Sequence, residues 1–243
     1  KSGLNKHADF VMETDDGVGQ IMAALDRHGL TENTLIIFSA DNGTSKGANI
    51  PQLAAQGHKV SAGFRGSKAD LWDGGHRVPF VARWPGKVAA GSSSDQLICL
   101  VDLFATLSEI TAGPLPSASA EDSVSFLPAL SGEPIVSTRA GVIHHSISGH
   151  FAYRQGKWKL LLARGSGGWT APKEKSIPAG TPVAQLYDME ADPGETTNLY
   201  ASQPEIAERL LTQLKSDISR GRSTDGAEAK NDTNTIRLWK SGR

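Results

Sequence analysis

The sequence predicts an α/β protein with a smaller antiparallel α+β unit toward its C-terminus, and three observations support this fold class. Helical and strand-like apolar patterns alternate over residues 1–113. A linker rich in Pro, Ser and Ala follows at residues 114–120. Several short strand patterns and one amphipathic helix come after this linker. We therefore expect a layered α/β domain over residues 1–139 and a small subdomain over residues 140–243.

In the first part, apolar residues at helical spacing predict a helix over residues 9–28, which ends before Gly29. Residues 34–39 are apolar and β-branched, and they predict a buried strand, expected to be parallel to its neighbours. A loop-rich stretch over residues 44–75 is the kind of long loop that often carries function. A second buried strand over 78–84 and a helix over 97–110 follow.

In the second part, short strands are expected at residues 141–145, 151–154, 157–163 and 186–188. Gln155-Gly156 predicts a hairpin turn between two of them. A helix begins near Pro204, because apolar residues repeat at helical spacing beyond it. The polar tail over residues 220–243 is expected to lie on the surface.

The composition excludes several classes of protein. The net charge of the 243 residues is 25 − 26 = −1, which argues against a generally basic nucleic-acid binder. Cys99 is the one cysteine, so the chain holds no internal disulfide and no multi-cysteine zinc site. No apolar run approaches the ~18 residues that a membrane span needs. The chain begins at Lys1 without a signal-peptide pattern, and we expect it to be cut from a longer protein.

Asp41 and Asn42 follow the first predicted strand directly. Ligands bind at the carboxyl edge of open α/β sheets, and these side chains offer two hard oxygen ligands suited to Ca²⁺ or Mg²⁺. Two ligands do not complete a six-coordinate shell, so others must come from elsewhere. On spacing alone, a turn without a metal is the commoner explanation of such a pair.

Lys68 lies in a glycine-flanked loop that leads into the second strand, where its ammonium group could anchor an anion. Taken alone, such a lysine is more often a solvated surface residue. His58 and His76 fall in the same loop-rich stretch and could line a pocket, while Asp73 and Arg77 could pair with each other.

The other histidines and the cysteine give weaker evidence of a functional role. His144 and His145 are neighbours on a predicted strand and point to opposite faces, so we interpret them as structural. Cys99 stands in an apolar context and is expected in the core.

Five segments in order give the chain a family resemblance. The stretches TLIIFSADNG, FRGSKADLWDGG, HRVPFVARWPG, YRQGKWKLLL and LYDMEADPGETTNL resemble the sulfatase family of the alkaline phosphatase superfamily. The resemblance covers about residues 9–222. It implies the C-terminal part of an alkaline-phosphatase-like mixed-sheet domain, followed by a small antiparallel subdomain.

The resemblance also implies chemistry, namely hydrolysis of sulfuric esters, with an aryl, steroid or glycan sulfate as substrate. Asp41 and Asn42 match the later pair of family calcium ligands, and Lys68 matches a family lysine that contacts the substrate sulfate. His58 is a weaker substrate-binding candidate. Calcium is the expected metal, with magnesium the weaker alternative, and export to the periplasm or outside the cell is expected by resemblance alone.

The chain departs from the family at the nucleophile. The family motif Cys/Ser-x-Pro-x-Arg, whose first residue becomes formylglycine, does not occur, because Leu-Val-Asp-Leu follows Cys99. The chain is therefore expected to be the C-terminal half of a sulfatase, inactive by itself and missing an N-terminal half. Two alternatives stay open: a phosphatase or phosphonate hydrolase of the same superfamily, and a truncated binding module without catalysis.

Overall fold

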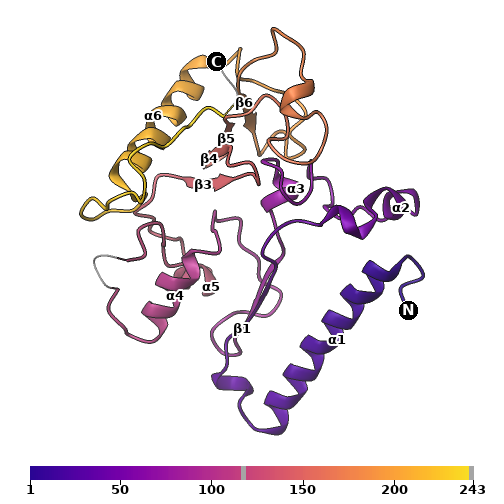
Figure 1. Cartoon of the computed structure of the whole chain (residues 1–243). Coiled ribbons are helices and arrows are strands. Elements are labelled where there is room, and N and C mark those ends of the chain that lie inside the picture. Colours follow the sequence, from indigo (N-terminus) through magenta and orange to yellow (C-terminus); the bar gives the residue numbers. More distant parts are fainter. Residues whose placement is uncertain (116–118, 241–243) are drawn as a thin grey trace.

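The computed structural model describes residues 1–115 and 119–240, and it contains two separate antiparallel sheets (Figure 1). β1 (Ile36–Ser39) and β2 (Phe80–Arg83) form a two-stranded ribbon. A four-stranded sheet lies beyond it along the chain. Residues 116–118 of the predicted linker and residues 241–243 of the predicted tail lie outside the described residues.

The first predicted helix is confirmed as α1 (Lys6–Arg27). The Asn5 side chain caps its start by accepting the Ala8 N–H at 3.0 Å, and Gly29 follows its end in the left-handed region at φ +67°. None of its residues is buried, so its apolar stripe, which includes Val11 and Ile21, stays open.

The first strand is correctly placed, but its predicted parallel pairing and burial are wrong. β1 runs antiparallel to β2, with Ile36 opposite Arg83, and Phe38 is 36% exposed. An apolar run predicts a strand without setting its direction. The connection to β2 contains only short helices, so it returns the chain without the long crossover helix that a parallel pair normally has.

The loop-rich stretch between these strands holds three short helices. Before it comes η1 (Thr31–Asn33), and within it come η2 (Lys46–Ala48), α2 (Ile50–Ala55) and α3 (Asp73–His76). The segment around α3 is the most buried part of this stretch, because residues 70–75 are all buried. It is also the part that faces the four-stranded sheet.

The second predicted helix begins later than expected. α4 (Asp102–Ile110) starts five residues after the predicted start at Leu97, because the Asp102 carboxylate accepts the Cys99 N–H at 2.8 Å and holds a turn there before the helix. Its buried side consists of Asp102, Ala105 and Thr106, whereas its apolar residues Phe104 and Leu107 are about half exposed. α5 (Leu127–Leu130) follows it.

The C-terminal part matches the prediction closely. β3 (Val142–His145), β4 (Phe151–Gln155), β5 (Trp158–Leu161) and β6 (Gln185–Asp188) form an antiparallel meander in that order. Gly156, at φ +55°, makes the predicted turn between β4 and β5. η3 (Glu174–Ser176) lies in the connection between β5 and β6.

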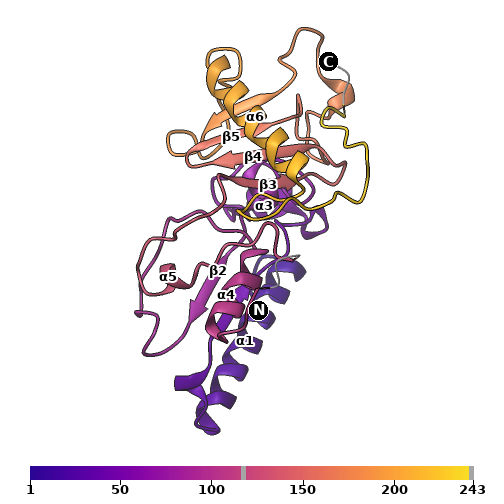
Figure 2. The same cartoon turned by 90° about the vertical axis from the view of Figure 1, so that its left-hand side faces the viewer.

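α6 (Pro204–Arg220) covers this sheet and completes the main core (Figure 2). Its buried leucines pack against the sheet residues Tyr153, Leu160 and Leu186. The described part of the tail returns over the same core, where Ile236 and Leu238 pack against it. The prediction of a surface tail is wrong for Arg222, Ser223 and Thr224, which are buried, whereas residues 225–240 are exposed or half-buried.

Candidate functional site

The structure places Asp41 and Asn42 just beyond the end of β1, as predicted. The Asp41 side chain is exposed, and Asn42 is half-buried. The Asn42 amide nitrogen donates to the Gly43 carbonyl at 3.0 Å, which leaves its Oδ1 oxygen available as an acceptor. Two hard oxygen donors therefore stand side by side at this end of the strand.

Backbone hydrogen bonds bring Lys68 to the same place. The Lys68 N–H donates to the Thr44 carbonyl, and the Gly43 N–H donates to the Gly75 carbonyl, both at 3.0 Å. These bonds join the segment 41–44 to the loop 64–77, which we call the α3 loop. The structure therefore brings the backbone of Lys68 next to the segment that follows Asp41 and Asn42, which lies more than twenty positions earlier in the sequence.

His58 does not join Asp41, Asn42 and Lys68 at this junction. Its side chain is exposed in the turn after α2, where its N–H donates to the Leu53 carbonyl at 2.9 Å. The same segment approaches Thr44 through a bond from Thr44 Oγ1 to the Val60 carbonyl at 3.5 Å. Within the described part of the chain, no hydrogen bond or ion pair joins His58 to Lys68, so the structure gives no support for a shared role of the two residues.

The junction requires glycine because the two backbones approach too closely for a side chain. A Cβ atom on Gly43 would lie 1.8 Å from the Gly74 carbonyl oxygen. A Cβ on Gly74 would lie 2.4 Å from the Gly66 carbonyl oxygen. The close packing of these chains explains why glycines cluster in this stretch.

A buried ion cluster holds the α3 loop from behind. Lys159 of β5 is fully buried, and its ammonium group lies 2.6 Å from Asp73 Oδ1 and 2.8 Å from Glu195 Oε1. Glu195 Oε2 accepts the Asp73 N–H at 2.6 Å. Arg154 and Arg77 approach the other Asp73 oxygen at 3.5 and 3.7 Å. The predicted Asp73–Arg77 pair therefore forms, as one edge of a larger cluster.

The two carboxylates of this cluster differ in pKa. Burial opposes ionisation of Asp73, but the charges of Lys159 and Arg154 outweigh it and lower its pKa. Burial raises the pKa of Glu195, and the nearby Asp73 charge adds to that effect. Asp73 is thus the more firmly charged partner of Lys159.

A second contact fixes the α3 loop beside the cluster. Arg65 lies over the Trp72 ring at 3.7 Å, and its Nη1 donates to the Glu195 carbonyl at 2.7 Å. The Trp72 indole N–H donates to Gln185 Oε1 at 3.1 Å. The Tyr187 hydroxyl donates to the same oxygen at 2.6 Å, and burial raises its pKa to about 12. Gln185 of β6 therefore holds the loop at Trp72, and the Glu195 carbonyl holds it at Arg65.

Asp70 ties the α3 loop to a second loop, residues 166–170. It is fully buried, and its Oδ2 accepts the Ser67 N–H at 2.9 Å. Its Oδ1 accepts the N–H groups of Trp169 at 2.8 Å and Thr170 at 3.0 Å. The segment that carries Lys68 is therefore bonded on one side to Thr44 and on the other to residues 166–170.

Two histidines meet between α3 and β3. The rings of His76 and His144 lie 4.2 Å apart, and both Nε2 atoms are buried without a hydrogen-bond partner. Burial, then the charge of Lys159, lowers the pKa of His76 to about 4. Burial and the neighbouring His76 lower the pKa of His144 well below its ordinary value. Both rings are therefore neutral near pH 7, in agreement with the structural role predicted for His144.

The side chains of this chain could supply only some of the ligands that a metal ion needs. No three acidic, histidine or cysteine side chains converge to hold a metal within residues 1–115 and 119–240. The oxygen donors of Asp41 and Asn42 suit calcium, but they need partners from outside this set. Cys99 is half-buried beside Arg139, and burial raises the pKa of its thiol to about 11, so it is no activated nucleophile.

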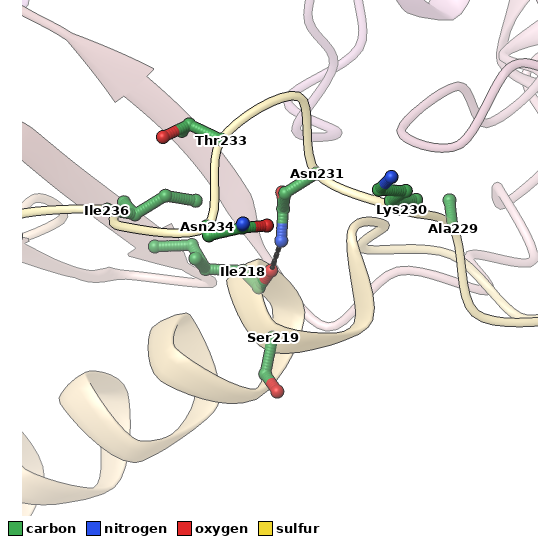
Figure 3. Close-up of a pocket in the computed structure, with 8 residues that line it drawn as sticks. All are labelled: Ile218, Ser219, Ala229, Lys230, Asn231, Thr233, Asn234 and Ile236. Atoms are coloured by element: carbon green, nitrogen blue, oxygen red, sulfur yellow. Dashed lines mark hydrogen bonds between the residues drawn. The ribbon is translucent and has the colours of Figure 1, made fainter.

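Two hollows lie away from this site. One of about 420 Å³ lies between the end of α6 and the returning tail and is lined by Asn231, Asn234 and Ile236 among others (Figure 3). Another of about 400 Å³ lies beside Trp84 and α5. Neither is lined by Asp41 or Lys68.

Sequence reasoning missed Lys159, Glu195 and Asp70. The only local signal was Lys159, a charged residue within the apolar strand pattern Trp-Lys-Leu-Leu. Such a residue is either on an exposed face or paired, and its partner Asp73 lies 86 positions away. No spacing rule connects positions so far apart.

Replacing Gly43 by Ala should disrupt the junction. Its methyl group would meet the Gly74 carbonyl, and overpacking of this kind costs about 1–3 kcal/mol. Gly17→Ala is the matched control, because Gly17 lies in α1 with open space around it, and alanine there should stabilise by about 0.5–1 kcal/mol. Urea unfolding of both variants measures the two effects. If both variants changed the free energy of unfolding by the same amount in the same direction, the close approach of Gly43 to the Gly74 carbonyl would be contradicted.

Acid should weaken the His76 contact. Because the pKa of His76 is about 4 in the folded chain and 6.5 in the reference state, the unfolded chain binds the extra proton between these pH values. The free energy of unfolding should therefore fall as the pH is lowered from about 6.5 toward about 4. Urea unfolding at several pH values should show a shallower fall for His76→Gln. The exposed His28→Gln should follow the unaltered chain, and identical profiles for all three would refute the burial of His76.

Comparisons with known proteins identify the family of the chain. A family model described as Sulfatase matches residues 1–113. The chain is 32% identical over 226 residues to N-acetylgalactosamine-6-O-sulfatase of Bacteroides thetaiotaomicron, covering 90% of this chain and 43% of that protein. It is also 32% identical over 226 residues to bovine arylsulfatase A, covering 88% of this chain and 43% of that protein.

A solved structure supports the fold. The match is to a sulfatase from work on glycosaminoglycan metabolism by Bacteroides thetaiotaomicron, with TM-score 0.74 and 31% identity, covering 90% of this chain and 45% of that one. The chain thus spans less than half the length of the relatives it matches. The predicted alkaline-phosphatase-like α/β fold is confirmed, and the chain belongs to the sulfatase family.

Proposed function

We propose that this chain forms part of a sulfuric ester hydrolase and supplies it with two calcium ligands and a sulfate-binding lysine. The observation that carries the proposal is the junction in which Lys68 bonds through its backbone to Thr44, two residues beyond Asn42. A divalent cation and an ammonium group on neighbouring loops suit the negatively charged oxygens of a sulfate group.

Asp41 and Asn42 would hold the calcium ion through their side-chain oxygens. Bound there, the ion would act as a Lewis acid toward the sulfate oxygens. Lys68, half-buried and fixed by its backbone, would stabilise negative charge on the sulfate or on the bridging oxygen. We assign no catalytic role to His58 or His76, because the first is exposed and the second is buried against His144.

The nucleophile and the remaining calcium ligands would come from sequence outside this chain. Neither Cys-x-Pro-x-Arg nor Ser-x-Pro-x-Arg occurs in the 243 residues. The exposed apolar surface of the N-terminal elements supports a larger domain in the parent protein. It comprises Phe10, Val11 and Ile21 of α1, Phe38 and Val81 of the ribbon, and Val101, Phe104 and Leu107 around α4. Exposed apolar area of this extent commonly marks an interface.

No helix among residues 1–115 and 119–240 is both long enough and apolar enough to cross a lipid bilayer.

Asp41→Ala should weaken calcium binding more than any other single change in this chain. Calorimetric titration of the full chain with Ca²⁺ measures the affinity, and removing one of two protein carboxylate or amide ligands should lower it at least about tenfold. Asp15→Ala removes an equally exposed carboxylate from α1 and should leave the affinity unchanged. Calcium binding that survives Asp41→Ala would refute the metal assignment and favour a binding module without this metal edge.

A further inference from the structure

Three loops converge at the candidate site, and one of them has no role so far. The segment 41–46 and the α3 loop supply the proposed calcium and sulfate ligands. The loop 166–170 belongs to the connection between β5 and β6, far along the chain, yet it is bonded directly to the other two. The loop 166–170 therefore belongs to one hydrogen-bond network with the segment that carries Lys68.

The backbone of this loop is firmly held. The buried Asp70 carboxylate binds the N–H groups of Trp169 and Thr170, and the Lys46 ammonium donates to the Trp169 carbonyl. A Cβ on Gly168 would lie 2.2 Å from the Ala69 carbonyl oxygen, so the loop packs tightly against the residue that follows Lys68. Its peptide groups on both sides of the indole are therefore immobilised.

The Trp169 side chain is nevertheless 39% exposed. A single exposed apolar residue is ordinary on a protein surface. What distinguishes this one is a rigid backbone beside a proposed sulfate-binding lysine, so that a ligand could pack on the ring at little conformational-entropy cost. Two polar side chains lie near this residue. Lys46 is exposed and bonded to the Trp169 carbonyl, and the half-buried Thr170 hydroxyl lies 3.3 Å from Ser67 Oγ.

We propose that Trp169 is a substrate-contacting residue that packs against the sugar ring of a sulfated glycan while Lys68 binds its sulfate group. A pyranose ring has an apolar face of C–H groups and an edge of hydroxyls, which matches an indole near Lys46 and Thr170. A simple aryl ring offers no hydroxyl groups to these neighbours, whose ammonium and hydroxyl groups keep hydrogen-bonding capacity beyond their bonds to the Trp169 carbonyl and Ser67 Oγ. The inference rests on the proposed function and deepens it by naming the substrate class.

The test is a binding measurement on the full chain with calcium present, so it does not require turnover. The probes are N-acetylgalactosamine 6-sulfate, 4-nitrophenyl sulfate and inorganic sulfate, and the affinities are measured by calorimetry or by the indole N–H signals in NMR. Trp169→Ala should weaken binding of the sugar sulfate by about three- to tenfold. It should leave binding of inorganic sulfate unchanged, and Trp169→Phe should keep most of the affinity for the sugar sulfate.

Two control variants distinguish a failure of the Trp169 proposal from a failure of the proposed sulfate-binding function. Lys68→Ala should weaken all three probes, and its failure to do so would refute the sulfate-binding role but not the contact at Trp169. Val136→Ala removes an apolar side chain that is 85% exposed in another segment, and it should change nothing.

The proposal is overturned if Trp169→Ala binds the sugar sulfate as tightly as the unaltered chain. It is equally overturned if the loss is as large for 4-nitrophenyl sulfate or for inorganic sulfate as for the sugar. If Trp169→Ala fails to fold, as judged by thermal unfolding, Trp169→Phe and Trp169→Gln decide the question. Gln then should lose affinity for the sugar sulfate and Phe should not.

Discussion

The structure depends on one buried ammonium group. Lys159 of the four-stranded sheet reaches Asp73 of the α3 loop and Glu195 beyond β6, and all three side chains are inaccessible or nearly so. Burying such charges is costly unless each is paired, and the short contacts of 2.6 and 2.8 Å supply that pairing. The cluster therefore imposes one arrangement of the loop on the sheet, because an alternative arrangement would leave a charge alone in the interior.

This arrangement is transmitted to the candidate site through backbone bonds. Asp73 is the first residue of α3. Gly75 of the same helix accepts the Gly43 N–H through its carbonyl, and the Lys68 N–H donates to the Thr44 carbonyl in the same junction. The C-terminal sheet is thus part of the site's support, although it contributes neither Asp41 nor Lys68. The same sheet presents the loop 166–170 on the other side of Lys68, through Asp70.

The elements that were predictable are those with local signals. The C-terminal meander, the turn at Gly156 and α6 all follow from apolar periodicity and a glycine at the turn. The positions of Asp41, Asn42 and Lys68 were also predictable, because family motifs surround them. Their spatial meeting was implied by the resemblance alone.

The rest depends on contacts between positions far apart in the sequence or on surfaces that this chain leaves exposed. The pairing direction of β1 could not be deduced, because an apolar run is compatible with either direction. The exposure of the apolar stripes of α1 and α4 went against the usual assumption that such stripes are covered within the same chain. The Lys159 cluster joins residues 36 and 86 positions apart. A domain boundary near residue 139 remains a prediction.

The most direct test of this account is amide hydrogen exchange in Lys159→Met. Removing the ammonium group leaves two buried carboxylates without their cation, so the α3 loop should open while the core under α6 stays closed. The amides of Lys68 and Gly43 should then exchange at least about tenfold faster, with the Leu214 amide of α6 unchanged. Unchanged exchange at Lys68 and Gly43, or an equal rise at Leu214, would contradict the claim that Lys159 holds the site in place.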